Sequence, residues 1–413
     1  MSGVADRLLE EEGDRSISSV VESELERLDE TSPTVPVINP VDWREVSRYL
    51  ADYLVREDRD REVLEELEKH GARLMLSPDQ KRIRPGIGLR LFDALGTDVP
   101  REESMKLMAA AEGVHIYTKG IDDIQDGDFE RNELPTLHFM MKEYLEQEGL
   151  KNGFGGKAEE LGRSMAENYF LAVKSRIPAA TSDLDDDCFS AETREELRGA
   201  IDDVQDDLAD GQNLDLAGTT IGRGDNLPNY LGGDLDVMEY TYQTNRGKTA
   251  EMFALLGRFA RIVDEDYDGD ELEEWGLKAG QAFQITDDTL DIEKGRYSDI
   301  EGNNYTVPVY IAERYLRSHP DRKMNERGER LSEILRKPEN TGEELKEAGQ
   351  IITGDTPAVE AAYNLAEHLS RYATGYENSE DVEGIDFDID WKDESHMDDI
   401  KNLTRLFGYQ REK

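Results

Sequence analysis

Apolar residues recur at helical spacing along almost the whole chain, and this periodicity is the strongest constraint on its fold. In AEMFALLGRFARIV, residues 250–263, large apolar side chains return every three or four positions, as they do on the buried face of an amphipathic helix. Strand-like alternation of apolar and polar residues is scarce. The pattern therefore predicts an all-α protein. The same spacing is found in residues 46–57, 103–126, 159–174, 273–291 and 357–373.

Charge and proline divide the chain into an N-terminal extension and a body. Residues 1–31 are acidic and able to form a helix but carry few large apolar side chains, and the three prolines of TSPTVPVINP are typical of a linker. We expect residues 1–40 to form an acidic extension and Pro-rich linker that can remain disordered, and residues 41–413 to form a single all-α domain. Its acidic or polar insertions are expected to be surface loops at 178–193, 217–234 and 376–395.

The 94 Asp and Glu residues outnumber the 49 Lys and Arg residues, giving a formal charge of −45 that is spread over the whole chain. Nucleic-acid binding is disfavoured, because no net basic field attracts a polyanion. In molar salt the Debye length falls to about 3 Å, which screens the repulsion among the excess carboxylates, so we interpret the chain as halophilic.

The absence of a run of about 18 apolar residues argues against a membrane span. The N-terminus lacks secretory features, and Cys188 is the single cysteine, so a cytoplasmic protein without internal disulfides is expected.

The first aspartate cluster, IDDIQD, ends a long apolar segment. A spacing of four places Asp122 and Asp126 about 40° apart on one helix face. The same face carries His115, Thr118 and Lys119. Such a polar stripe on an apolar helix is costly to bury unless a divalent cation and an anionic ligand neutralise it. The candidate metal ligands of this cluster are Asp122, Asp123 and Asp126.

One D-D-x-x-D match is expected by chance in so acidic a chain, and a second copy is present at Asp202, Asp203 and Asp206. The first cluster differs from this copy because a basic residue, Arg131, and a proline–threonine pair follow it. Nothing comparable follows the second copy, which we interpret as a solvated helix face.

The second aspartate cluster lies in AFQITDDTLD, on a segment that is otherwise apolar on both sides. Gln284, Asp287 and Asp291 share one helical stripe there, and Asp288 completes the cluster. Upstream, Lys248 and Thr249 place a cation and a hydroxyl at the start of another apolar helix.

A basic triplet, Lys81, Arg82 and Arg84, stands just before a proline that opens a helix. Ion pairing with nearby glutamates is the simplest interpretation of such a triplet. Together with the aspartate clusters, however, it suits the chemistry of a diphosphate. Carboxylates can chelate Mg²⁺, and the metal ions and basic side chains can then neutralise a diphosphate leaving group. An apolar cavity would protect the resulting carbocation from water.

These motifs, in this order, resemble the trans-isoprenyl diphosphate synthase (polyprenyl synthetase) family. KRIRP is similar to the family's G-G-K-R-x-R-P, DDIQDGDFERNELPT to its first aspartate motif, and GQNLDL, KTA and AFQITDDTLD to its later blocks. The resemblance spans about residues 43–375 and is strongest to archaeal geranylgeranyl and farnesyl diphosphate synthases; with the acidity, it favours a haloarchaeal source. It implies a bundle of about ten or more helices around a central cavity, usually dimeric, with the two aspartate-rich helices facing each other.

The resemblance also implies an activity: a Mg²⁺-dependent prenyltransferase that condenses isopentenyl diphosphate with an allylic diphosphate in isoprenoid biosynthesis. The allylic diphosphate ionises, the isopentenyl double bond attacks the cation, and loss of a proton leaves a chain five carbons longer, with a C15–C20 product favoured. By position, the family implies that Asp122, Asp126 and Asp287 bind Mg²⁺ directly and that Asp123, Asp288 and Asp291 support them. It also implies that Arg131 and Lys248 bind the allylic diphosphate, with Thr249 and Gln284 near the reacting carbons. Isopentenyl diphosphate would be bound by Lys81, Arg82 and His115.

Product length is set in this family by side chains just before the first aspartate motif. Tyr117 and the smaller Thr118 stand five and four residues before Asp122. The aromatic residue resembles the cavity floor of archaeal geranylgeranyl diphosphate synthases. On an ideal helix Tyr117 lies about 140° from the polar stripe, so a tyrosine of the core is equally compatible with the sequence.

The chain departs from the family at several phosphate-binding positions, and two alternatives stay open. Losing two cations would cost on the order of 1.5–3 kcal/mol each, unless Lys119 or Arg296 compensates. The chain could be a diverged, non-catalytic or regulatory subunit that forms a hetero-oligomer with an active synthase. A class I terpene cyclase is less well supported, because such enzymes typically lack a second D-D-x-x-D. The departures are Asn132 and Glu133 for Arg and Gly, Asp79 and Gln80 for two glycines, Asn304 for Lys, and Arg163 for the Asp of a Gly-Asp pair.

Overall fold

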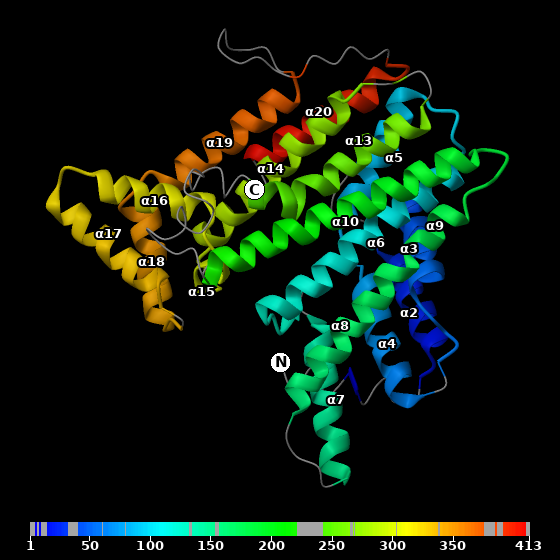
Figure 1. The fold of residues 1–413 in the computed structure, drawn as a ribbon, viewed down its shortest axis with the longest axis horizontal. Helices are drawn as coiled ribbons and strands as arrows, with labels where there is room; N and C mark the ends of the chain where they lie inside the picture. The colour runs from blue at the N-terminus through cyan, green and yellow to red at the C-terminus, as the bar shows by residue number, and fades with distance from the viewer. Residues whose placement is uncertain are drawn as a thin grey trace. The chain divides into compact units, whose positions relative to one another are not determined.

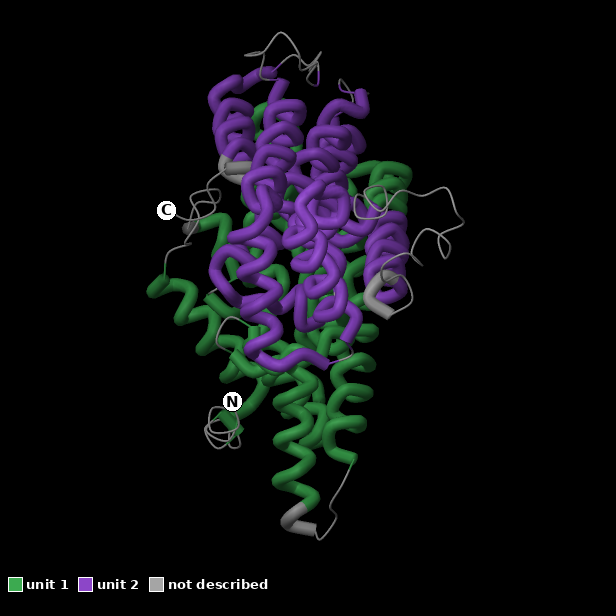
Figure 2. The backbone as a smooth tube through the Cα atoms, turned by 90° about the vertical axis from the view of Figure 1, so that its left-hand side faces the viewer, with its two compact units in different colours: residues 1–201 green, residues 202–413 purple. Residues whose placement is uncertain are grey.

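The computed structural model describes residues 5, 8–9, 15–31, 40–59, 61–78, 80–131, 134–152, 157–220, 243–264, 267, 269–302, 304–337, 339–375, 385 and 391–409. Within these residues the regular structure is almost entirely helical, which confirms the all-α prediction (Figure 1). The chain forms two compact units, residues 1–201 and residues 202–413 (Figure 2). The division drawn from the sequence, an extension to residue 40 and one domain beyond it, remains a prediction.

Unit 1 consists of helices and one minimal hairpin. The two strands pair antiparallel, with Glu130 opposite Pro135 and Arg131 opposite Leu134. Helix α10 begins in unit 1 and continues into unit 2. The elements are α2 (Ile17–Glu30), α3 (Pro40–Leu54), α4 (Glu62–Leu76), α5 (Ile83–Leu95), α6 (Arg101–Asp126), β1 (Glu130–Arg131), β2 (Leu134–Pro135), α7 (Leu137–Asn152), α8 (Ala158–Arg176), α9 (Pro178–Ser182) and α10 (Ala191–Thr220).

Helix α6, which ends in the first aspartate cluster, lies at the centre of unit 1 and packs on α3, α5, α8 and α9. Its core face is lined by small and medium apolar residues such as Met108, Ala111 and Val114, all buried. These allow neighbouring helices to approach closely. The helix ends at Asp126 and is capped by Gly127, whose φ of +75° suits glycine and whose N–H donates to the Asp123 carbonyl.

Helix α2, in the acidic N-terminal segment, packs on α3 and α4. Its apolar face, including Val20 and Leu28, is buried, and Ser16 caps its N-terminus. At its other end, the Arg44 guanidinium of α3 donates to the carbonyl oxygens of Leu28, Asp29 and Thr31 at 3.1, 2.9 and 3.2 Å. These bonds satisfy acceptors that a helix C-terminus leaves without intrahelical partners.

Unit 2 is built around α14, which carries the second aspartate cluster and packs on α13, α16, α19 and α20. Buried apolar residues of the helices from α14 to α19 form two apolar clusters in it. Two of the predicted loops, 217–234 and 376–395, lie largely outside the described residues, and the third, 178–193, contains α9. Beyond α10, the elements are η2 (Arg246–Ala250, a π-helical turn), α13 (Glu251–Val263), α14 (Glu271–Glu293), α15 (Ser298–Glu301), α16 (Val307–Ser318), α17 (Arg322–Leu335), α18 (Gly342–Gly354), α19 (Ala358–Ala373) and α20 (Glu394–Tyr409).

A close approach of two glycines joins α10 to η2. A Cβ atom at Gly211 would lie 2.4 Å from the Gly247 carbonyl carbon, and one at Gly247 would lie 2.5 Å from the Gly211 Cα. No larger residue fits at either position without moving the backbone. This approach brings Lys248, the next residue, beside α10.

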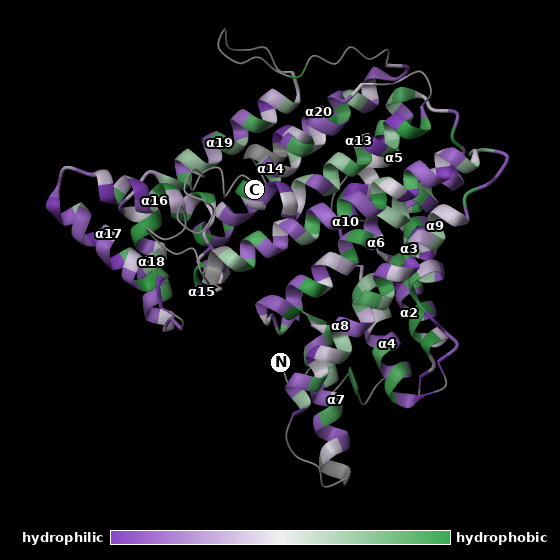
Figure 3. Cartoon of the chain, viewed as in Figure 1, coloured by the Kyte–Doolittle hydropathy of each residue, from purple (hydrophilic) through white to green (hydrophobic). Residues whose placement is uncertain are grey.

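The helices carry hydrophilic residues along their length (Figure 3). Among the helices that the structure describes, none combines the length and apolar character required to cross a membrane.

We predict that Gly211→Ala destabilises the protein by about 1–3 kcal/mol, because the added methyl group pushes α10 and η2 apart. Gly199→Ala is the matched control on the same helix, since nothing lies within 4 Å of a Cβ there. We expect that control to be neutral or to stabilise by up to about 1 kcal/mol through helix propensity. The measurement is thermal unfolding in concentrated KCl. Equal midpoints for the two variants would contradict the close approach.

Candidate functional site

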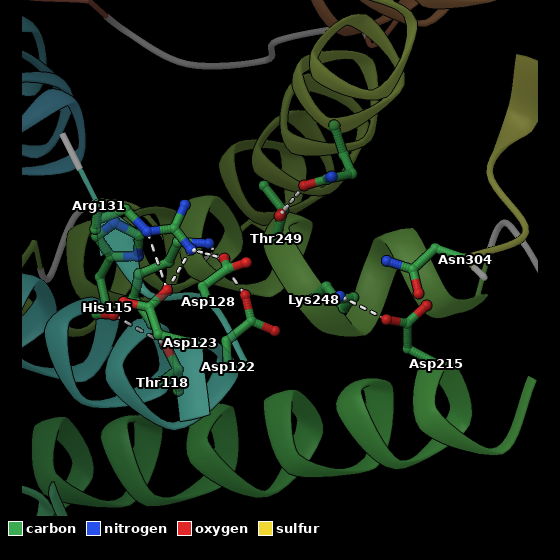
Figure 4. Close-up of polar contacts among 12 residues, drawn as sticks. His115, Thr118, Asp122, Asp123, Asp128, Arg131, Asp215, Lys248, Thr249 and Asn304 are labelled. Atoms are coloured by element: carbon green, nitrogen blue, oxygen red, sulfur yellow. Dashed lines mark hydrogen bonds and ion pairs between the residues drawn. The ribbon is translucent and has the colours of Figure 1, made fainter. Parts of the chain in front are cut away.

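The first aspartate cluster combines exposed and buried carboxylates at the C-terminal end of α6. Asp126 is exposed and Asp122 partly so, whereas Asp123 is buried. Asp122 accepts from the Lys119 ammonium at 3.0 Å. Asp123 is held by the guanidinium of Arg131, whose Nε donates at 3.0 Å and whose Nη2 also donates to Asp123 (Figure 4). Burial raises the pKa of Asp123, and the charge of Arg131 opposes that rise.

Arg131 is placed by the β1–β2 hairpin, which follows α6 directly. Its Nη2 also donates to Asp128 at 3.0 Å, and the Thr136 hydroxyl donates to the Asp128 carbonyl at 2.6 Å. The proline–threonine pair that the sequence singled out therefore closes the hairpin next to the arginine. Here Arg131 binds aspartates, and its predicted contact with an allylic diphosphate remains a proposal.

One turn or two before the cluster, α6 carries the other residues of the polar stripe. Burial, together with the charges of Arg84, Lys119 and Arg131, lowers the pKa of His115 well below its usual value, so its imidazole is neutral. The Thr118 hydroxyl donates back to the carbonyls of Val114 and His115 at 3.0 and 3.1 Å.

Tyr117 lies away from this stripe. Its ring is paired with the ammonium of Lys174 on α8, whose Nζ is 5.5 Å from the ring centroid. Burial raises the pKa of Tyr117. Helical spacing alone puts Tyr117 about 140° from the stripe. A role in setting product length stays a prediction.

The basic triplet divides into residues with different surroundings. Lys81 is exposed, whereas Arg82 is fully buried. Arg82 Nε donates to the Ser47 hydroxyl at 2.7 Å and Nη2 to the Met75 carbonyl at 2.9 Å, and Nη1 lies 3.4 Å from Glu112. Burial lowers its pKa. Arg82 thus ties α3, α4 and α6 together, an arrangement that its neighbours in the sequence do not reveal.

The second aspartate cluster repeats the construction of the first. Asp287 is exposed and Asp288 is buried. The Gln284 side chain donates to Asp288 at 2.7 Å and accepts from the Thr249 hydroxyl. Burial, followed by the charge of Asp299, raises the pKa of Asp288 well above its usual value. Gln284 and Thr249 therefore act together to orient a carboxylate.

Lys248 places a positive charge near this second cluster. Its Nζ lies 2.6 Å from Asp215 of α10, across the Gly211–Gly247 contact (Figure 4). Asn304 donates to Asp299 at 3.4 Å. Burial, followed by Asp291, raises the pKa of Asp299 to about 7. Asp215 and Asp299 received no role from the sequence; the GQNLDL block contains Asp215, but nothing in the sequence shows that it meets Lys248.

Comparison with known proteins identifies the family. The polyprenyl synthetase profile matches residues 65–352. The chain belongs to the polyprenyl synthetase family. It is therefore a prenyltransferase by descent, as the sequence motifs predict.

The polyprenyl synthetase relatives include archaeal enzymes. The chain is 28% identical over 303 residues to the geranylgeranyl diphosphate synthase of Saccharolobus solfataricus, covering 71% of this chain and 78% of that protein. It is 28% identical over 328 residues to the short chain isoprenyl diphosphate synthase of Methanocaldococcus jannaschii, covering 77% and 83%.

Solved structures share the fold. A geranylgeranyl pyrophosphate synthetase from Pyrococcus horikoshii superposes with a TM-score of 0.65 at 18% identity, covering 95% of this chain and 99% of that one. A geranylgeranyl pyrophosphate synthase from Corynebacterium glutamicum, in complex with isoprenyl diphosphate and magnesium, has a TM-score of 0.67 at 20% identity, covering 90% and 98%.

The donors of both clusters fit the Mg²⁺ that the polyprenyl synthetase family implies. Among the described residues, no three carboxylate, histidine or cysteine side chains are grouped so that they could hold a metal ion by themselves. Mg²⁺ is usually bound through one or two carboxylates, with water and substrate phosphates completing its shell. Asp288, buried in the second cluster, and the partly buried Asp299 beside that cluster both have raised pKa values, and a divalent cation would relieve this concentration of negative charge.

Of the departures from the polyprenyl synthetase pattern, residues 79, 132 and 133 lie outside the described residues. Gln80, Arg163 and Asn304 lie inside them. Arg163, on α8, approaches the end of the first cluster: its Nη2 would lie 3.3 Å from a Cβ at Gly127.

His138 lies at the start of α7, close behind the Arg131 hairpin. It is buried, its ring packs at 6.2 Å against that of Phe129, and neither ring nitrogen has a hydrogen-bond partner within the described part of the chain. Burial, with a smaller effect of Arg163, lowers the pKa of His138 to about 4.

We predict that His138 makes the folded protein sensitive to acid. The unfolded histidine, with a pKa near 6.5, binds a proton before the folded one does, so the free energy of unfolding falls as the pH drops from about 6.5 towards 4. His138→Phe should lose less stability than wild type between pH 7 and pH 5, by on the order of 1 kcal/mol. Thermal midpoints at the two pH values measure this. His368→Phe, at an exposed histidine of α19, is the control and should follow wild type; a His138→Phe protein that also follows wild type would refute the prediction.

Proposed function

We propose that this member of the polyprenyl synthetase family condenses isopentenyl diphosphate with an allylic diphosphate to give a C15–C20 product. The observation that carries the proposal is the shared construction of the two aspartate clusters. In each, an accessible carboxylate is followed by a buried one whose orientation is fixed by a hydrogen-bonding side chain: Arg131 for Asp123, and Gln284 for Asp288. Such fixed carboxylates suit the binding of a metal diphosphate.

The proposed direct ligands of Mg²⁺ are Asp122, Asp126 and Asp287. When bound, Mg²⁺ would neutralise the diphosphate and make it a better leaving group. Asp123 and Asp288 are buried and hydrogen-bonded, and we assign them the supporting role. Outer partners of this kind fix the geometry of metal ligands and tune their affinity.

The protein's own groups would hold the substrates during the reaction. Lys248, fixed by Asp215, offers an ammonium to the allylic diphosphate. His115, being neutral, can donate one hydrogen bond to isopentenyl diphosphate, and the exposed Lys81 can add a charge. In the reaction the allylic C–O bond would break and its electron pair would leave with the diphosphate. The isopentenyl π electrons would form the new C–C bond, and the resulting cation would lose a proton from the carbon beside it to the released diphosphate.

The direct test is an assay of the full-length protein with Mg²⁺, labelled isopentenyl diphosphate and each of the C5, C10 and C15 allylic diphosphates. Multimolar KCl is used because we also propose that the acidic chain is a halophilic, cytoplasmic enzyme. Products of C15–C20 are expected, and their length also tests Tyr117 as a cavity floor. Folded protein that makes no product with any of the three allylic substrates would refute the proposal.

We predict that Asp122→Ala and Asp287→Ala each lower kcat at least about 100-fold, because each removes an accessible carboxylate from a metal site. The chain provides a matched control in the second D-D-x-x-D copy on α10, where Asp202 is exposed. Asp202→Ala should keep wild-type kcat. Activity of Asp287→Ala equal to that of Asp202→Ala would exclude the metal assignment.

The non-catalytic, regulatory alternative is favoured by one observation: Asn304, beside Asp299, stands where the family motif has a lysine. Under the proposed function, we predict that Asn304→Lys lowers KM for the allylic diphosphate about 10-fold while changing kcat less than about 3-fold, since an added ammonium strengthens diphosphate binding. Steady-state kinetics with Asn402→Lys, an exposed position of α20, as the charge-matched control measures this.

The outcome that would favour the alternative is different. A wild type without measurable turnover that gains activity with Asn304→Lys would mark a decayed catalytic site. In that case co-purification with an active synthase would become the next test.

A further inference from the structure

The loop that follows the second aspartate cluster folds back onto Asp291. The Ser298 N–H and hydroxyl both donate to Asp291 Oδ2, at 3.1 and 2.5 Å. Arg296 Nε lies 3.3 Å from Oδ1, and the Arg296 N–H donates to the Asp291 carbonyl at 3.0 Å. Both carboxylate oxygens are therefore contacted by the same short loop.

This loop is held in an unfavourable backbone conformation. Tyr297, between the two residues that contact Asp291, has a φ of +57°, in the left-handed region that side chains other than glycine rarely adopt. Gly295, two residues earlier, has a φ of +73°. A tyrosine keeps such a conformation only when its surroundings stabilise it.

What stabilises it is the contact of the Tyr297 ring with α18. The ring occupies the space where Gly349 lacks a side chain: a Cβ there would lie 2.0 Å from Tyr297 Cε1 and 2.4 Å from Cζ. The ring also packs against the apolar cluster that includes the buried Ala348 and Ile352. The absence of a side chain at Gly349 thus leaves room for the Tyr297 ring. The packed ring holds the backbone at Tyr297, and the next residue, Ser298, donates to Asp291.

We propose that Tyr297 is a positioning residue for the second aspartate cluster, and that the Tyr297–Gly349 contact sets the orientation of the Asp291 carboxylate and with it the cluster's affinity for a divalent cation. This inference rests on the proposed function, because it assigns a role towards the metal that the cluster would bind. The residues to which it assigns this role, Tyr297 and Gly349, lie outside both the aspartate motif and the helix that carries the motif.

The test measures Mn²⁺ binding to the full-length protein without substrate, from the electron paramagnetic resonance signal of free Mn²⁺. Gly349→Ala, whose methyl group would overlap the Tyr297 ring, should weaken Mn²⁺ binding about 10-fold. Disturbing residues that hydrogen-bond to metal ligands typically has an effect of this size. Gly354→Ala is the matched control on α18, since nothing lies within 4 Å of a Cβ there, and it should bind as wild type does.

Three further variants separate positioning from core filling. Tyr297→Gly removes the ring but tolerates the positive φ, and the double variant with Gly349→Ala should bind Mn²⁺ no more weakly than Tyr297→Gly alone. Ser298→Ala should also weaken binding about 10-fold with an unchanged melting temperature. Its control is Ser318→Ala, an exposed serine of α16 whose hydroxyl donates only to its own helix in the described structure.

If Gly349→Ala and Tyr297→Gly lower the melting temperature but leave Mn²⁺ affinity unchanged, the ring only fills the core and the proposal is overturned. It is overturned as well if Ser298→Ala binds as Ser318→Ala does, or if wild type binds no Mn²⁺. Because Mn²⁺ binding requires no turnover, a protein with the expected binding pattern but no product would refute the proposed function alone. An active enzyme whose Mn²⁺ affinity is the same in these variants as in wild type would refute the positioning role alone.

Discussion

Burying a carboxylate on an apolar helix is the constraint on which both aspartate clusters depend. An ionised carboxylate loses its hydration when it is buried and must be given hydrogen bonds or an opposite charge in return. For Asp123 the partner is Arg131, placed by a hairpin of two-residue strands. For Asp288 it is Gln284, one turn earlier on the same helix and itself held by Thr249. The β1–β2 hairpin thus places Arg131, and the η2 turn places Thr249, which holds Gln284.

The residue patterns on single helices could be predicted, because they depend on periodicity alone. The all-α class, the stripe with His115 and Asp122, and the placement of Tyr117 off that stripe all follow from 3.6 residues per turn. Family membership followed from the order of short motifs. The sequence also separated the two D-D-x-x-D copies by what comes after them, and Thr136 does close the hairpin that carries Arg131.

Contacts between distant segments could not be predicted in the same way. The basic triplet looked uniform in the sequence, yet Arg82 is fully buried among Ser47, Met75 and Glu112. Likewise, the residues around Asp215 do not show that it pairs with Lys248, and those around Gly349 do not show that the Tyr297 ring packs against it. Each depends on a close approach of two helices or loops that only the folded chain creates. The mutual placement of the two aspartate helices is a contact of this kind and stays a prediction.

The docking of α2 changes how the acidic N-terminal segment should be regarded. Its apolar face is buried against α3 and α4, and Arg44 binds three carbonyl oxygens around its C-terminal end. Opening α2 would expose that face and leave the Arg44 guanidinium without these acceptors. Local opening is governed by such losses, and helices that share them open as one cooperative segment. The amide protons of α2 should therefore exchange with solvent at rates closer to those of α3 and α4 than to those of a free peptide, and proteases should find few cleavage sites in residues 17–30.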